Sequence, residues 1–211
     1  LNVLVNEHRT YLACFGLLFA IIGSLGAGRS GLARAGAIAI CVLGLLGWQR
    51  NAVWENEYTL WAAAAERAPN AFRVQSNLGL ALYERGEVAT AHRALSRALE
   101  LNPRYARTWS NMGLVREGLG HYEAAEKAYK TALDLRPDLA GPRANLGRLY
   151  LGNGRYGEAI SVLEQALAID PRSAVARTNL GLAHQRAGRL DLAVAAYRRA
   201  LTVGGASGEL Y

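Results

Sequence analysis

Residues 105–138 read YARTWSNMGLVREGLGHYEAAEKAYKTALDLRPD, and this stretch decides the fold because its pattern recurs every 34 residues. Six columns of identical residues keep that period: Asn77, Asn111, Asn145 and Asn179; Gly79, Gly113, Gly147 and Gly181; Gly86, Gly120, Gly154 and Gly188; Ala91, Ala125, Ala159 and Ala193; Ala98, Ala132, Ala166 and Ala200; and Pro69, Pro103, Pro137 and Pro171. A fixed period of this length indicates repeated units that each bury an apolar face against the next unit.

The second glycine column and the proline column divide each repeat into two helices. A glycine where the first helix stops can adopt the left-handed conformation that closes a helix, and the residue before a proline avoids the helical region. We predict the helix pairs 71–85 and 87–101, 105–119 and 121–135, 139–153 and 155–169, and 173–187 and 189–202. The first glycine column is expected to let the two helices approach closely, around the large side chains Leu95, Tyr129, Leu163 and Tyr197.

The length and residue pattern of these units resemble those of tetratricopeptide repeats. The resemblance implies an all-α protein with a right-handed α-solenoid of about four and a half repeats, in which the first helix of each pair lines a concave, ligand-binding groove. The register extends upstream through Trp54, Trp61 and Pro69, so residues 52–67 are predicted to form an unpaired second helix.

An almost uncharged region precedes the repeats. Helices are predicted at about 11–27 and 32–49, with Arg34 as the one charged residue in them. Seventeen residues at 1.5 Å each span roughly 25 Å, close to the ~30 Å hydrocarbon core of a bilayer. We predict a transmembrane hairpin that contacts membrane lipid through residues 11–48, because nothing else in the chain is apolar enough to cover two such helices. A signal peptide would explain the first segment but not the second.

The predicted organisation is a membrane hairpin (1–50), a junction half-repeat (51–70), four repeats (71–204) and a flexible tail (205–211). Three tryptophans are expected at the membrane junction, either packed between the two parts or anchored in the membrane interface. They are Trp48, Trp54 and Trp61.

Candidate ligand-binding residues lie on the first helix of each predicted pair. Asparagine is a poor helix former, so the column Asn77, Asn111, Asn145 and Asn179 needs a physical reason. A side-chain amide carries both a donor and an acceptor. The column resembles the asparagine ladder in the repeats of some O-GlcNAc transferases, which implies pairing with the backbone of an extended peptide. The alternative is that each amide bonds to a loop or helix end within the solenoid.

Several arginines accompany the asparagines on the same helices. They either recognise acidic groups of a ligand or form a solvated face. They are Arg73, Arg107, Arg143, Arg148 and Arg177.

Composition and motifs exclude several function classes. The chain has a net charge of +7 but lacks the aromatic pattern of a nucleic-acid surface. Cys14 and Cys41 stand alone in the apolar segments, and the four histidines are scattered, so we expect neither a metal site nor a cofactor. No phosphate-binding loop or nucleophile motif occurs. We therefore expect a protein or peptide partner, and no catalysis by this chain.

A second resemblance covers the region before the repeats. Two groups of residues resemble the join between membrane helices and repeats in bacterial relatives of the transmembrane and tetratricopeptide O-mannosyltransferases. The first is Glu7, His8, Arg9, Tyr11 and Leu12, with Ala13 where that family has proline; the second is Arg50, Asn51, Trp54, Leu60, Trp61, Pro69 and Asn70.

This resemblance implies a bacterial inner-membrane protein with periplasmic repeats, a polyprenyl-phosphate sugar donor and protein acceptors. The catalytic acidic residues of that family lie in an early external loop, which this chain lacks. Two hypotheses follow: a membrane-anchored module that binds protein segments in its groove, for glycosylation or as a stand-alone scaffold, or a fragment of a protein O-glycosyltransferase whose catalytic region lies elsewhere.

Overall fold

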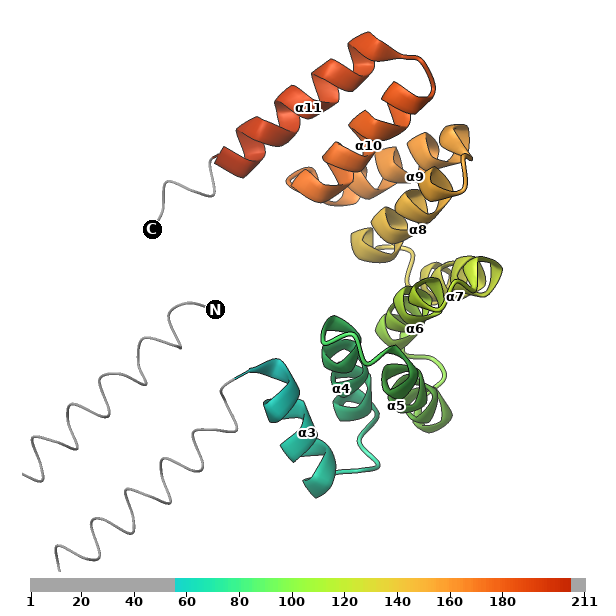
Figure 1. Ribbon diagram of the computed structural model, residues 1–211, viewed down its shortest axis with the longest axis vertical. Helices are drawn as coiled ribbons and strands as arrows, with labels where there is room; N and C mark the ends of the chain where they lie inside the picture. The colour runs from blue at the N-terminus through green and yellow to red at the C-terminus, as the bar shows by residue number, and fades with distance from the viewer. Residues whose placement is uncertain (1–55, 206–211) are drawn as a thin grey trace, which may run out of the picture. The chain divides into compact units, whose positions relative to one another are not determined.

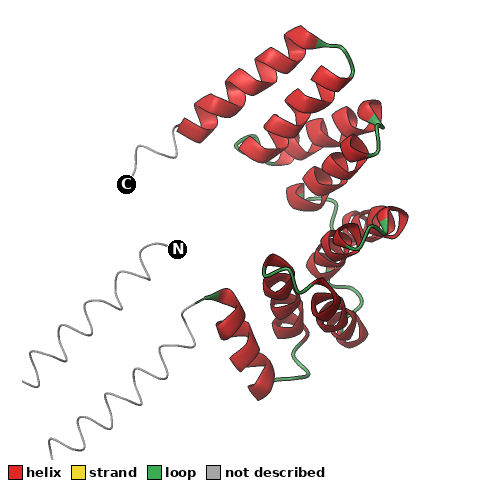
Figure 2. Cartoon of the chain, viewed as in Figure 1, coloured by secondary structure: helices red, strands yellow, loops and turns green. Residues whose placement is uncertain are grey.

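The computed structural model describes residues 56–205, and all regular structure in this range is α-helical (Figures 1 and 2). The predicted membrane hairpin, Trp48, Trp54 and residues 206–211 lie outside the described residues. Among the helices that are described, none combines the length and the hydrophobicity needed to cross a bilayer.

The chain divides after Glu66 into two units. The described part of the first unit, residues 56–66, holds helix α3 (Glu57–Arg67) except its last residue, and α3 contains Trp61. It follows Asn56, whose side chain accepts a hydrogen bond from the Thr59 backbone N–H (3.0 Å). This contact satisfies one of the backbone donors that a helix start leaves free. The helix predicted for residues 52–67 is therefore confirmed over 57–67.

Four helix pairs make up the second unit, and every predicted helix of the repeats is present, with most ends within a residue of those predicted. The pairs are α4 (Phe72–Glu84) and α5 (Val88–Leu101), α6 (Ala106–Gly118) and α7 (Tyr122–Leu135), α8 (Ala140–Gly152) and α9 (Tyr156–Ile169), and α10 (Ala174–Arg186) and α11 (Leu190–Gly205). The first and second helices of each pair are called helix A and helix B below.

A left-handed glycine closes each helix A, as the sequence predicts. Gly86, Gly120, Gly154 and Gly188 have φ values of 82°, 78°, 74° and 76°. The backbone N–H that follows then reaches back to the last turn; for example, Glu87 donates to the Leu82 carbonyl at 2.9 Å. These bonds satisfy carbonyls that a helix end would otherwise leave unpaired.

The first glycine column lets helices A and B of a pair meet closely. A Cβ at Gly79 would lie 2.6 Å from Leu95 Cγ, and one at Gly147 would lie 2.5 Å from Leu163 Cγ. Tyr129 occupies the same place opposite Gly113. Leu95, Tyr129 and Leu163 are fully buried, so the predicted function of this glycine column is confirmed.

In each pair of neighbouring repeats, helix A of the second repeat packs against both helices of the first, and more extensively against its helix B. The A helices of successive repeats contact one another, and each helix B contacts the helix A that follows it. Figure 1 shows α4 and α6 on the inner side of the curve of the repeat unit, with α5 and α7 on the outer side. Between α4 and α6, the buried Thr108 hydroxyl donates to the Ser76 hydroxyl at 3.0 Å.

Candidate functional site

One stripe along each helix A is accessible to solvent. Residues spaced by four, three and four positions fall on one face of a helix, and every residue of this set is partly or fully exposed. We call these residues the helix-A face: Arg73, Asn77, Leu80 and Glu84; Arg107, Asn111, Leu114 and Gly118; Gly141, Asn145, Arg148 and Gly152; Val175, Asn179, Leu182 and Arg186.

The four asparagines of the helix-A face are half-buried, and their amides are not used within the solenoid. Among residues 56–205, none of their side chains donates or accepts a hydrogen bond. The alternative that each amide bonds to a loop or helix end within the solenoid is therefore wrong for the described residues. Four donor-acceptor groups consequently stand in a row, one on each repeat.

Three of the five candidate arginines lie on the helix-A face, and their surroundings differ. The guanidinium of Arg73 lies 5.6 Å from the centre of the Phe72 ring and 5.9 Å from that of Tyr105, within the range of a cation–π contact. Arg107 is exposed, and its guanidinium makes no hydrogen bond or ion pair with any residue that the structure describes. The stacking of Arg73 fixes a charge at the start of α4, while Arg107 stays available.

Arg148 joins two repeats instead of standing free. Its guanidinium donates to both carboxylate oxygens of Glu117 on α6, at 2.6 Å and 2.9 Å. Glu117 also accepts a hydrogen bond from the Tyr129 hydroxyl at 3.2 Å. Burial, and then the negative charge of Glu117, raise the pKa of that hydroxyl, so Tyr129 remains a neutral donor. The structure thus gives Arg148 a structural contact that its sequence position did not indicate.

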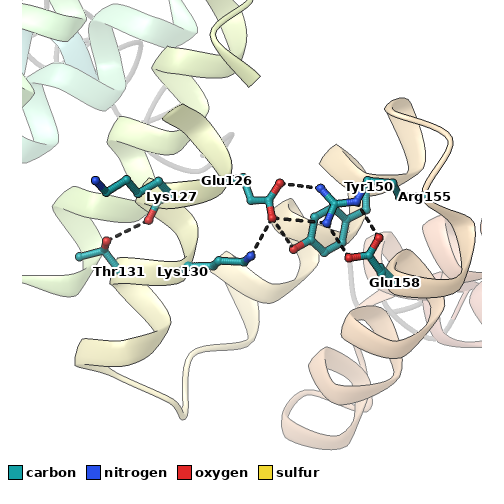
Figure 3. A network of polar contacts seen from close by, with 7 residues as sticks. All are labelled: Glu126, Lys127, Lys130, Thr131, Tyr150, Arg155 and Glu158. Carbon is teal, nitrogen blue, oxygen red and sulfur yellow. Dashed lines mark hydrogen bonds and ion pairs between the residues drawn. The ribbon is translucent and has the colours of Figure 1, made fainter. Parts of the chain in front are cut away.

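Polar contacts also join the second and third repeats around Glu126 of α7 (Figure 3). This carboxylate accepts hydrogen bonds from the Tyr150 hydroxyl (2.9 Å) and Arg155 (2.6 Å), and pairs with Lys130 (2.7 Å). Burial raises the pKa of the Glu126 carboxyl, but the three donors together outweigh it and lower the pKa to about 2. Glu126 therefore stays charged, and this junction carries a fixed ion network.

Comparisons with known families agree with this geometry. Family models described as tetratricopeptide or TPR repeats match residues 79–120, 104–172 and 144–209. These residues are tetratricopeptide repeats. No curated protein sequence matches the chain, and nothing among the matches bears out the resemblance of residues 6–79 to O-mannosyltransferases.

Solved structures share the tetratricopeptide fold. A crystal structure of MamA is 23% identical, with a TM-score of 0.61, over 71% of this chain and 87% of that one. A thermophilic TPR protein from Thermus thermophilus is 25% identical, with a TM-score of 0.63, over 74% and 87% of the two chains. Pseudomonas aeruginosa pilF is also 25% identical, with a TM-score of 0.60, over 63% and 60%.

A further contact recurs in every tetratricopeptide unit and was missed from the sequence. The fourth residue of each helix A donates a side-chain N–H to the proline carbonyl six residues earlier. The pairs are Gln75 with Pro69 (3.0 Å), Trp109 with Pro103 (2.7 Å), Arg143 with Pro137, and Arg177 with Pro171. We call this contact the proline-carbonyl bond. The side chains of Arg143 and Arg177 are therefore bonded within the solenoid and are not free in the way that Arg107 is.

Residues 56–205 contain no group of three or more histidine, cysteine, aspartate and glutamate side chains placed to hold a metal ion. His184 is buried on α10, and its Nδ1 has no hydrogen-bond partner among these residues.

Proposed function

We propose that the tetratricopeptide repeats bind an extended protein or peptide segment along the helix-A face. The observation that carries the proposal is the row of half-buried asparagine amides without hydrogen bonds on four successive A helices. A polar group held near a surface without a partner loses little on binding a ligand that can pair with it. A peptide backbone offers both an acceptor and a donor, as the amide does.

The spacing of the repeats favours an extended ligand. Packed helices lie about 8–10 Å apart, and an extended chain rises about 3.3 Å per residue. One asparagine would therefore meet roughly every third residue of the ligand, and four would cover a segment of about 8–10 residues. A short helix of the same number of residues would be only about 15 Å long and would not reach all four.

Replacing the four asparagines by alanine tests the surface. Peptides selected from a displayed library against the full chain in detergent serve as probes. If four hydrogen bonds contribute about 0.5–1.5 kcal/mol each, the quadruple variant should weaken binding by well over tenfold. Alanine is the better helix former, so loss of binding would not come from loss of the helices.

A matched control carries three alanine substitutions in one exposed column of helix B, where the fourth residue is already alanine. They are Arg93→Ala, Lys127→Ala and Ser161→Ala. This control should bind as the unaltered chain does. Unchanged affinity of the asparagine variant for every selected peptide would show that the helix-A face is not the binding surface.

The proposal extends to a membrane anchor. Residues 11–27 and 32–49 would hold the repeats at the bacterial inner membrane, with the repeats in the periplasm; the apolar sequence and the positions of Arg29 and Arg34 in and beside the link support this. Protease treatment of spheroplasts tests the orientation. Periplasmic repeats would be digested, whereas repeats protected until the membrane is broken would reverse the assignment.

A second candidate is the recruiting part of a polyprenyl-phosphate-sugar-dependent protein O-glycosyltransferase. It is favoured by the motif residues in 6–12 and 50–70. The gene sequence upstream of the Leu1 codon tests it. Several further apolar segments with an acidic external loop would support this candidate, and their absence would remove it.

A further inference from the structure

A cavity of about 310 Å³ lies at the start of α6 and combines basic and apolar walls. It is lined by Arg104, Tyr105, Ala106, Arg107, Leu135, Arg136 and Leu139. Its residues come from the turn before α6, the first turn of α6, the end of α7 and the turn that leads from α7 to α8. The arginines therefore converge from two separate segments of the second repeat.

We call this pocket the arginine cavity. Two of its three arginines have no acidic partner among the described residues. Arg136 donates to both oxygens of Asp138, at 2.7 Å and 2.6 Å. The guanidinium groups of Arg104 and Arg107 make no ion pair or hydrogen bond with any described residue. Helix α6 also begins without a side-chain cap from Tyr105, so its first N–H groups add positive potential at the same place.

Comparison with the other repeats shows that only the second one has arginine at all three positions. The equivalent residues, in steps of 34, are Asn70, Arg73 and Asn102 in the first repeat, Asp138, Gly141 and Asp170 in the third, and Arg172, Val175 and Gly204 in the fourth. Each of the other repeats therefore has at most one arginine at these positions. The tetratricopeptide fold does not require the set of three, so the fold alone does not account for it.

We propose that the arginine cavity binds a carboxylate side chain of an acidic protein segment. Arginine's planar fork matches a carboxylate through paired hydrogen bonds, and Leu135 and Leu139 offer apolar contact to the methylene groups of a glutamate. The inference rests on the proposed function, because Arg107 lies one helical turn before Asn111 on the helix-A face. A segment lying along the asparagines would bring its acidic residue to the cavity.

The test uses the full chain in neutral detergent and fluorescein-labelled hexaglutamate, with hexaglutamine as the uncharged probe. Fluorescence anisotropy gives the dissociation constants. The variant Arg104→Gln/Arg107→Gln removes both free charges at exposed positions. Because hydrogen bonds between charged groups are stronger than those between neutral groups, we expect its Kd for hexaglutamate to rise at least tenfold. Hexaglutamine should bind weakly and equally to both proteins.

The control Arg172→Gln/Arg198→Gln removes the same net charge from exposed positions outside the cavity and should change the Kd less than about twofold at 0.15 M salt. Equal weakening by both double variants would mean general charge attraction and would overturn the inference. The inference would also be overturned if inorganic phosphate displaced labelled hexaglutamate at a lower concentration than unlabelled glutamate peptide does, because that result would assign the cavity to phosphate groups. Vesicles rich in phosphatidylglycerol that displace the probe equally well would assign it to lipid and reject it too.

The asparagine variant keeps the two proposals distinguishable. If hexaglutamate binding depends on the arginines while library-selected peptides bind normally to the quadruple alanine variant, the proposal for the helix-A face is refuted and that for the cavity is supported. If the quadruple alanine variant no longer binds those peptides while the arginine variant binds hexaglutamate unchanged, the proposal for the cavity is refuted and that for the helix-A face is supported.

Discussion

Gly147→Ala will destabilise the third repeat, whereas Gly152→Ala on the same helix will not. A Cβ at position 147 would lie 2.5 Å from Leu163 Cγ and 2.8 Å from Leu163 Cδ2, whereas one at position 152 would meet no atom within 4 Å. Leu163 is fully buried, so it has little room to move away. Both substitutions change a glycine of α8 to alanine, and only the one at position 147 introduces a close contact.

The expected magnitudes follow from two opposing effects. Alanine is favoured over glycine in a helix interior by about 1 kcal/mol, while overpacking a well-filled core costs about 1–3 kcal/mol, and the short contacts favour the upper end. Gly147→Ala should therefore lower the free energy of opening of α8 and α9 by about 1–2 kcal/mol. Gly152→Ala should raise it by up to about 0.5–1 kcal/mol, because its Cβ lies in open space.

Hydrogen exchange with mass spectrometry measures this opening in the full chain, peptide by peptide, which suits an array that does not unfold in one step. Amides of α8 and α9 should exchange about 5–30 times faster in Gly147→Ala and no faster in Gly152→Ala. Combining Gly147→Ala with Leu163→Ala should remove most of the effect of the glycine substitution, because the clashing atoms are gone. Exchange in Gly147→Ala as slow as in the unaltered chain would refute the packing argument.

Three further outcomes are expected. Folding lowers the pKa of the Glu126 carboxyl from 4.5 to about 2, so the charged carboxylate stabilises the fold above pH 4.5 and this stabilisation is lost as the pH falls toward 2. After solvent screening, we expect it to contribute about 1–2 kcal/mol to the free energy of unfolding. Hydrogen exchange should show a loss of protection over this pH range that is absent in Glu126→Gln. Trp109→Phe removes the donor to the Pro103 carbonyl and should lower the free energy of opening of α6 by about 0.5–1 kcal/mol, measured by hydrogen exchange of its amides. Gly120→Ala places a side chain at φ 78° in open space and should cost about 1 kcal/mol from backbone strain alone, measured in the same way.

The helices and their close contacts were predictable because each depends on residue identities that repeat. Gly120 marks a helix end through its own backbone freedom, and Gly113 marks a contact because Tyr129 recurs in step with it. Such features need only the spacing within one repeat. The unbonded asparagines were predictable as a row, but their lack of internal partners required the structure.

Contacts between different repeats could not be predicted in this way. Arg148 meets Glu117 because stacking brings α8 against α6, and no spacing rule within a repeat pairs those residues. The proline-carbonyl bond escaped notice for another reason. Its donors, such as Gln75 and Trp109, share an N–H group and not an identity, so a search for identical columns passes over them.

The donor and the acceptor of the proline-carbonyl bond lie six residues apart in the same stretch of chain. The turn between two repeats therefore forms this bond without help from any other repeat. Whole units can therefore be duplicated or deleted in the gene without dismantling any turn. Such an event upstream or downstream of the second repeat would change how many asparagines lie on either side of the arginine cavity. The number of repeats would then set how many ligand residues can bind on each side of the acidic residue. A gain or loss of repeats would change this length without any point mutation.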